Sequence, residues 1–170
     1  MKRTAIALAA LVLATAFAGA AETKIKGIDL DKPRVRNASG SALGLFLGQP
    51  TGVTYRQGIS KTDSLEFKAA WDLVDSSKDA AAFGFQANWL LEFPGTIIIE
   101  DADIPPYVGI GLSVGVGSGG VALGFRVPVG LVHRFPKAPL ELGLEVGLGM
   151  LLFPATSFDV DGGLALRYRF

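Results

Sequence analysis

The sequence predicts an all-β fold, an eight-stranded antiparallel up-and-down barrel that occupies residues 41–170. Through most of this region apolar residues recur at every second position, which is the side-chain period of a β-strand and not of an α-helix. Short stretches that are polar or contain Gly and Pro separate the alternating segments, and connections this short join antiparallel neighbours. The alternating segments number eight, and an even number in simple succession suits a meander that closes on itself.

The composition argues against several classes of protein. Hydrophobic residues make up 49% of the 170 residues, and the mean hydropathy of +0.40 is high for a soluble protein. The absence of cysteine excludes a disulfide framework and a lipid-modified N-terminal cysteine. Lys+Arg and Asp+Glu are each 16, so the charge balance indicates no nucleic-acid partner.

Residues 1–20 have the pattern of a cleavable secretory signal peptide. Lys2 and Arg3 form a positive start, residues 5–17 are apolar, and Ala18-Gly19-Ala20 is a small-x-small cleavage site. A membrane anchor is the weaker reading, because the apolar run is short, rich in Ala and followed by that site. Cleavage after Ala20 leaves 170 − 20 = 150 residues and a formal charge of 14 − 16 = −2. Residues 21–40 are polar and rather basic, and we expect a loosely packed leader there.

One uncharged stretch is long enough to span a membrane as a helix. Residues 107–125 contain no charge, but seven of these nineteen residues are glycines, each of which costs about 1 kcal/mol relative to Ala in a helix. Val108, Ile110 and Leu112 begin a period of two, and Ser118-Gly119-Gly120 marks a turn. We therefore predict a β-hairpin, with a helix packed through small residues as the rival.

Four segments make up the first half of the predicted barrel. Residues 41–48 carry Leu43, Leu45 and Leu47 on one face, and Gln49-Pro50-Thr51-Gly52 forms a tight turn. The second strand ends at about Gly58, and residues 60–62 turn the chain into a strand over residues 63–73. A polar loop at residues 75–79 leads into a strand over residues 80–93, whose apolar face alternates with polar or small residues.

The second half begins after the longest connection, residues 94–106. Its apolar run Ile97-Ile98-Ile99 either prolongs a strand or packs under the barrel mouth. Strands are then predicted at residues 107–117, 120–135, 139–152 and 158–170. Pro128 removes a hydrogen-bond donor in mid-strand, but the alternation keeps its phase across it, so no bulge is predicted there.

Alternation alone does not say which face points inward, because a soluble lipocalin-like barrel and a membrane barrel have opposite faces. Three observations favour the membrane barrel. The polar face of the last four strands is largely Gly, Ala and Ser with single charges, which suits a crowded interior. A tilted strand needs roughly 9–11 residues to span a bilayer, and the last six predicted strands are at least that long. Aromatic residues fall at or near strand ends, where interfacial girdles lie, and we expect Trp71, Trp89, Tyr168 and Phe170 to anchor the barrel there.

The charges on the inward face then need partners, because an unpaired buried charge is costly. Turn positions set Arg134 opposite Glu141, Glu141 opposite Arg169, and Glu145 opposite Ala165 and diagonal to Arg167. A structural network that fills the interior is one reading, and a proton or ion path is the other. The predicted interior charges are Arg56, Glu66, Lys68, Arg126, Arg134, Glu141, Glu145, Arg167 and Arg169.

No catalytic, cofactor-binding or metal-ligating residue is predicted. The sequence has one histidine, His133, which alternation places on the outer face, and the residue two positions on is Phe135 and not a serine. The glycines of residues 115–120 are followed by neither Lys-Ser/Thr nor a helix, so they match no phosphate-binding loop. The acids at the end opposite the C-terminus form either a solvated rim or a divalent-cation rim; they are Asp72, Asp75, Asp79, Asp159 and Asp161.

The chain resembles small bacterial outer-membrane β-barrels of the eight-stranded OmpX/OmpA-like type, and within them a poorly characterised group. The last strand alternates aromatic and apolar residues and ends in Phe170, as the C-terminal signal of these barrels does. None of the matching pieces is catalytic. They are residues 44–52 (GLFLGQPTG), 106–111 (PYVGIG), 126–131 (RVPVGL), 138–142 (APLEL) and 167–170 (RYRF).

The resemblance implies an outer-membrane location, a periplasmic leader at residues 21–40, and insertion of a monomer by the barrel-assembly machinery with help from periplasmic chaperones. Its surroundings would be outer-membrane lipids and lipopolysaccharide. We expect a non-enzymatic protein with a structural role in the envelope and a filled interior. The alternatives are a barrel that binds lipid or a small ligand, a lipid-modifying enzyme and a small channel. Short loops opposite the termini argue against an adhesin.

Overall fold

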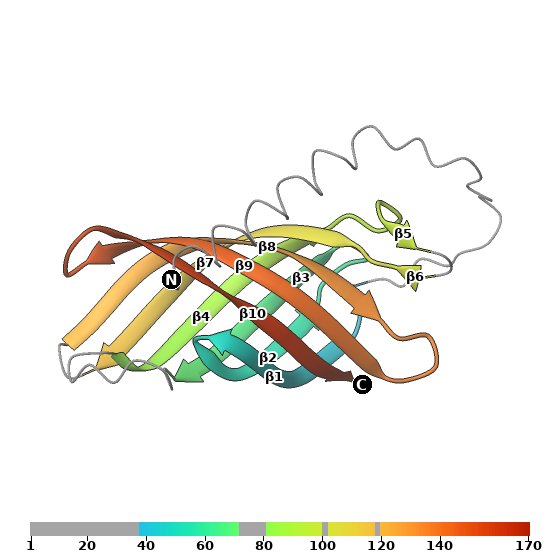
Figure 1. Ribbon diagram of the computed structural model, residues 1–170, viewed down its shortest axis with the longest axis horizontal. Helices are drawn as coiled ribbons and strands as arrows, with labels where there is room; N and C mark the ends of the chain where they lie inside the picture. The colour runs from blue at the N-terminus through green and yellow to red at the C-terminus, as the bar shows by residue number, and fades with distance from the viewer. Residues whose placement is uncertain (1–37, 72–80, 100–101, 118–119) are drawn as a thin grey trace.

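The computed structural model describes residues 38–71, 81–99, 102–117 and 120–170 (Figure 1). In these residues it is an all-β fold in which eight antiparallel strands close into a barrel in the order β1-β10-β9-β8-β7-β4-β3-β2. The eight are joined up and down in succession, and β5 and β6 form a separate two-stranded sheet. The strands are β1 Ser41–Gln49, β2 Thr51–Gly58, β3 Asp63–Trp71, β4 Ala81–Glu92, β5 Ile98–Ile99, β6 Ala102–Asp103, β7 Pro106–Gly117, β8 Gly120–Arg134, β9 Leu140–Phe153 and β10 Ser157–Arg169.

The barrel has two distinct ends. We call the end where β1 begins and β10 finishes the termini end; there Phe170 N donates to Ser41 O at 2.9 Å. The opposite end, which carries the turns between β1 and β2 and between β9 and β10, is the far end. The longest strands, β8 and β9, have 15 and 14 residues, whereas β1 and β2 have 9 and 8.

The connection between β4 and β7 contains the element that the sequence left unassigned. The run Ile97-Ile98-Ile99 neither prolongs β4 nor packs under the barrel mouth: β5 and β6 pair with each other as a small hairpin beside the termini end (Figure 1). Ile104 N donates to Ile97 O at 2.9 Å to close it, and His133 Nδ1 on β8 lies 3.4 Å from Asp103 O. Both Ile98 and Ile99 are exposed.

The register confirms one predicted strand pairing and corrects another. Arg134 lies opposite Glu141, as the turn at residues 136–138 predicts. Glu141, however, lies opposite Arg167 and not Arg169, and Glu145 lies opposite Gly163 and not Ala165. The prediction was wrong because it centred the turn between β9 and β10 on residue 155, whereas Ser157 pairs with Leu151, which centres it one residue earlier. Because each strand runs opposite to its neighbour, that single residue moves every pair by two.

Alternation along the strands separates the two faces of the wall. In β3 the even-numbered residues from Ser64 to Ala70 are buried, while Phe67 and Trp71 on the other face are exposed. Large exposed apolar side chains occur on all eight barrel strands, so the outer wall is a continuous apolar belt. Within the part of the chain that the structure describes, no helix has the length and apolar composition of a membrane-spanning helix.

Candidate functional site

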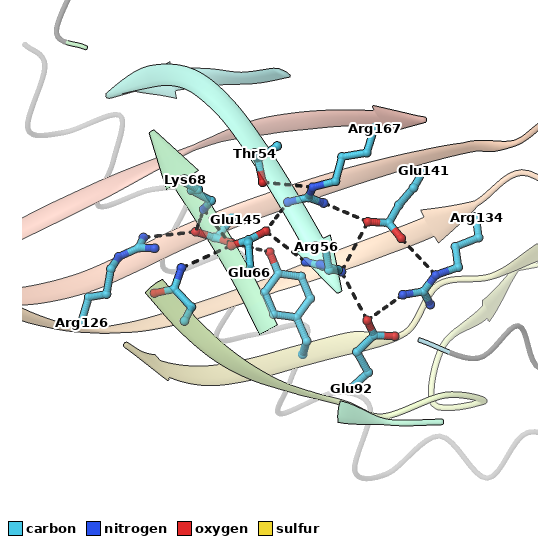
Figure 2. A network of polar contacts seen from close by, with 12 residues as sticks. Thr54, Arg56, Glu66, Lys68, Glu92, Arg126, Arg134, Glu141, Glu145 and Arg167 are labelled. Atoms are coloured by element: carbon cyan, nitrogen blue, oxygen red, sulfur yellow. Dashed lines mark hydrogen bonds and ion pairs between the residues drawn. The ribbon is translucent and has the colours of Figure 1, made fainter. Parts of the chain in front are cut away.

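The inside of the barrel holds the densest set of charged side chains in the described residues. Ten charged residues are buried there, each 8% exposed or less, and they comprise five cations and five acids, so their formal charges cancel. Figure 2 shows these residues, apart from Asp161, reaching toward one another from several strands of the barrel. We call this set the interior network: Arg56, Lys68, Arg126, Arg134, Arg167, Glu66, Glu92, Glu141, Glu145 and Asp161.

The half of the network nearer the termini end is built around Glu141 on β9. Its carboxylate accepts from Arg134 Nε at 3.0 Å and from Arg167 Nη1 at 2.9 Å, and it lies 3.4 Å from Arg56 Nη1. Glu92 on β4 joins the same cluster across the lumen, 2.6 Å from Arg134 and 3.3 Å from Arg56. Three arginines therefore share two carboxylates from opposite walls.

Glu66 on β3 links this cluster to the other half of the network. It pairs with Arg167, lies 3.4 Å from Arg56 Nη2 on one side, and lies 3.2 Å from Lys68 Nζ on the other. Lys68 in turn pairs with Glu145. The ion pairs thus form a continuous alternation of positive and negative groups, and Glu66 is the acid through which the two halves connect (Figure 2).

The half nearer the far end centres on Glu145. Arg126 Nη2 donates to Glu145 Oε1 at 3.1 Å and also pairs with Asp161 on β10. Tyr107 on β7, which is 1% exposed, donates its hydroxyl to Glu145 Oε2 at 2.8 Å. Glu145 therefore accepts from two strands and pairs with Lys68 from a third, so one carboxylate ties β9 to β3, β7 and β8.

Neutral side chains complete the surroundings of these charges. Thr54 Oγ1 accepts from Arg167 Nε at 3.2 Å, and Asn88 Nδ2 donates to Glu66 Oε2 at 3.3 Å. Lys68 Nζ lies 4.1 Å from the centre of the Phe46 ring on β1, and Arg56 lies 5.1 Å above the Tyr107 ring, both cation–π distances. With Phe46, every strand of the barrel contributes a contact to the interior network.

Inward-facing glycines make room for these long side chains. A Cβ on Gly147 would meet the guanidinium of Arg126 and the carboxylate of Asp161. A Cβ on Gly130 would lie 2.5 Å from the hydroxyl of Tyr107. Small residues indicated the interior face in the sequence. In the structure they leave the space that the charged and aromatic side chains of other strands occupy.

The far half of the interior contains a cavity. Its volume is about 330 Å³, and Gln86, Ser113, Asp159 and Asp161 are among its lining residues. Among the buried polar atoms without a hydrogen-bond partner are Nε and Nη1 of Arg126, whose Nη2 pairs with the lining residue Asp161, and Oδ1 of Asn88. Polar atoms of this kind are ordinarily satisfied by buried water, and this cavity is large enough to hold it.

The structure places the predicted interior charges at different depths. Eight of the nine belong to the interior network. Arg169 lies two residues beyond Arg167, the partner of Glu141, at the termini end of the barrel. There its Nη2 donates to Ser39 O at 3.3 Å. Sequence reasoning missed Glu92, Tyr107 and Asp161 as members. Their positions carry the signal, since each lies on the inward parity of its strand. The prediction, however, includes only charged residues and assigns Asp161 to an acidic rim.

The remaining singled-out residues lie on the outer wall or at the ends. Trp71, Trp89, Tyr168 and Phe170 are all exposed on the outer face. His133 is half-buried on that face, with its ring edge-on to Phe135 at 4.7 Å. Of the predicted acidic rim, Asp159 is exposed but Asp161 is buried against Arg126, so it is no part of a solvated rim. Asp72, Asp75 and Asp79 lie outside the described residues.

The hairpin of β5 and β6 has its own polar contact. Gly95 N donates to Asp103 Oδ1 at 3.0 Å, and burial raises the pKa of the Asp103 carboxyl. Across the described residues, no group of three or more His, Cys, Asp or Glu side chains is arranged to hold a metal ion.

The geometry of the interior network is suited to cross-linking strands. Each of its arginines meets at least two carboxylates, and charge-assisted hydrogen bonds are the strong ones in a low-dielectric interior. Removing one partner would leave a buried charge uncompensated, so the members depend on one another. No protein-family model, curated protein or solved structure matches this sequence.

Proposed function

We propose that this chain is an integral outer-membrane β-barrel protein with a structural role in the envelope, and that its interior network closes the lumen. The observation that carries the proposal is the distribution of polarity in the wall: ten charges are buried inside the barrel while large apolar side chains are exposed around the outside. In water this arrangement would expose the apolar surface and bury the charges, which is unfavourable on both counts. In a bilayer the same arrangement is the favourable one.

The lengths of the strands and the start of the chain support a membrane barrel of the bacterial outer membrane. Strands β3, β4 and β7–β10 have between 9 and 15 residues, enough to cross a bilayer core when tilted. The signal-peptide pattern of residues 1–20 supports export, and β10 alternates apolar or aromatic residues with polar or small ones like the last strand of the barrels that the sequence resembles. Insertion by the barrel-assembly machinery, as a monomer among phospholipid and lipopolysaccharide, belongs to the same proposal.

A closed lumen is supported by the density of contacts across it. Glu92 on β4 pairs with Arg134 on β8 and Arg56 on β2, and Arg167 on β10 pairs with Glu66 on β3. In the barrel order none of these pairs belongs to neighbouring strands, so each contact reaches over one or two intervening strands and helps to block the lumen. Barrels of eight strands have interiors narrow enough for side chains to fill.

Fractionation and heat-modifiable gel mobility test the proposal directly. We expect the mature protein in the outer-membrane fraction, and we expect unboiled samples in detergent to migrate differently from boiled ones, because a closed barrel resists unfolding by detergent. A protein that is recovered in the soluble fraction and migrates alike before and after boiling would rule out a membrane barrel.

The non-enzymatic part of the proposal has its own test. His133, the single histidine of the chain, lies on the outer wall beside Phe135 and Asp103 O rather than beside a serine. We expect lipid A mass spectra to be unchanged by the presence or absence of the protein. A reproducible difference in acyl chains would favour the lipid-modifying alternative.

A further inference from the structure

An apolar groove runs over the outer wall of β2, β3, β4 and β7. Its volume is about 440 Å³, and its lining is apolar. The groove exists because two outward positions hold alanines: Ala87 lies opposite Phe67, and Ala69 lies opposite Phe85. Each alanine leaves a hollow beside a phenylalanine, in a belt whose other outward side chains are mostly large.

The register shows in which direction the groove runs. Partners around the barrel lead from Leu43 to Tyr55, Phe67, Ala87 and Leu112. The same row continues through β8 and β9 and reaches Phe158 on β10. The last residue of β1, Gln49, pairs with Gly162 on β10. Phe158 lies four residues beyond Gly162 toward the far end, so the row that began near the start of β1 ends beyond the other end of that strand. The row therefore climbs from the termini end at β1 toward the middle of the wall at β7.

A polar cluster lies on the outer face at the end of this groove that is nearer the termini end of the barrel. Ser41 Oγ donates to Gln57 Oε1 at 2.7 Å, and Tyr55 OH donates to the same oxygen at 2.6 Å. Gln57 Nε2 uses one hydrogen on Gly58 O at 3.2 Å. Tyr55 OH also lies 3.4 Å from Ser41 Oγ. The second Nε2 hydrogen can be donated to an ester or phosphate oxygen, and the remaining hydroxyl lone pairs can accept from an ammonium or hydroxyl group. Tyr55 belongs both to this cluster and to the groove lining.

We propose that this wall binds a glycerophospholipid of the termini-side leaflet. The ester and headgroup region meets Ser41, Tyr55 and Gln57, and an acyl chain lies in the groove over Ala69 and Ala87. The polar cluster at the edge and the apolar groove climbing away from it match the two parts of an amphiphile. The inference rests on the proposed membrane location, since only a bilayer supplies lipid to this wall.

A second copy of the chain is the other occupant to consider, and the shape of the groove disfavours it. A twofold dimer uses the same patch on both subunits, so each hollow would be filled only if a side chain beside the partner's groove entered it. Apolar hollows without partner atoms lose the dispersion contacts that stabilise an interface. An acyl chain fills a single hollow from one side.

Native mass spectrometry of the protein released from detergent micelles tests the groove. The protein is reconstituted with phosphatidylethanolamine and phosphatidylglycerol and then extracted. We expect the unmodified protein to retain a phospholipid, and Ala87→Phe, which fills the hollow, to reduce the retained fraction roughly tenfold. Leu144→Phe on the opposite wall adds bulk to the same apolar belt and should leave retention unchanged. Heat-modifiable mobility shows that each variant still forms the barrel.

Variants of the polar cluster test the other end of the lipid. Tyr55→Phe keeps the ring that lines the groove and removes the hydroxyl, and we expect retention to fall roughly fivefold, the loss of about one hydrogen bond. Tyr168→Phe is the matched control, because it removes an exposed outer hydroxyl on β10 that belongs neither to the polar cluster nor to the groove lining, although Tyr168 lies opposite Leu43. Equal retention in Tyr55→Phe and the control would overturn the role of the cluster.

The outcomes separate this inference from the proposal on which it rests. Unmodified protein that inserts into vesicles but retains no lipid, or retains it equally in Ala87→Phe, overturns the lipid site and leaves the membrane barrel intact. A dimer that Ala87→Phe disrupts would show that a second copy occupies the groove. Protein that fails to enter vesicles at all contradicts the membrane barrel itself.

Discussion

Glu66 has more cationic partners than a single carboxylate can neutralise, since Arg56, Lys68 and Arg167 all contact it. It is 0% exposed, so water cannot compensate for a lost partner. A buried ion pair adds little over a well-packed apolar pair, but removal of one member leaves the other charge uncompensated. The importance of Glu66 therefore follows from its shared position and not from the strength of any one bond.

Substitution of Glu66 should be among the most destabilising changes in the barrel. Glu66→Gln keeps the shape but leaves three cations around a neutral group, and we expect the free energy of unfolding to fall by about 3–5 kcal/mol. Denaturant unfolding of the protein in detergent measures this change. Asp159→Asn, an exposed acid at the far end, is the control and should change stability by less than about 0.5 kcal/mol. Equal effects of the two variants would show that the network does not stabilise the fold.

Two glycines on β9 offer a matched test of interior space. A Cβ at Gly147 would collide with the paired ends of Arg126 and Asp161, which must shift to make room for it. A Cβ at Gly149 meets Phe125 O at 3.5 Å, an ordinary contact. We expect Gly147→Ala to lower the free energy of unfolding by about 1–3 kcal/mol and Gly149→Ala to leave it nearly unchanged. The opposite order would contradict the position of the Arg126 side chain against Gly147.

At the scale of elements, β10 closes the barrel against β1. Ser41 and Phe170 exchange backbone hydrogen bonds, with Phe170 N donating at 2.9 Å and Ser41 N donating at 3.3 Å. Eight register pairs then run from Ala42 to Gln49 along the seam. The last strand therefore carries both the closing contacts and the exposed aromatic end.

Deletion of Phe170 should impair assembly of the barrel. It removes both hydrogen bonds with Ser41 and the exposed terminal aromatic ring, and we expect the level of folded protein in the outer membrane to fall. Immunoblots of membrane fractions, with and without boiling, measure that level. Phe158→Ala is the control, because Phe158 is 90% exposed on the same strand at the far end. Normal levels of the truncated protein would show that the terminal aromatic is not an assembly signal.

Pro128 shows how an element tolerates a residue that its strand disfavours. Val127, Pro128 and Val129 pair in unbroken register with Leu148, Gly147 and Val146, so the absence of a bulge at Pro128 is confirmed. The irregularity in this strand pair lies instead between Leu123 and Gly124, near the far end. The unbroken alternation correctly predicted the absence of a bulge at Pro128, because a bulge adds one residue and would have exchanged the inward and outward positions after it.

At the scale of the whole molecule, the balance of five buried cations and five buried acids gives an interior without net charge. We expect the unmodified protein to give no steady single-channel currents in planar bilayers, because the ion pairs cross the lumen. The double variant Glu66→Ala/Arg167→Ala keeps the formal charge and removes two crossing side chains, so it should pass more current. Steady currents from the unmodified protein would contradict a closed lumen and favour the channel alternative.

The sequence by itself determined the fold class, the positions of the eight barrel strands and the two faces of each, because a period of two assigns every side chain to a face. It also determined the pairing of Arg134 with Glu141, since a short turn sets the register of a hairpin. Only the tertiary structure decided which charges meet across the lumen. Arg167 reaches Glu66, and Glu92 reaches Arg56 and Arg134, over intervening strands. Such contacts depend on how the sheet closes and how far its register climbs, and no local pattern encodes either.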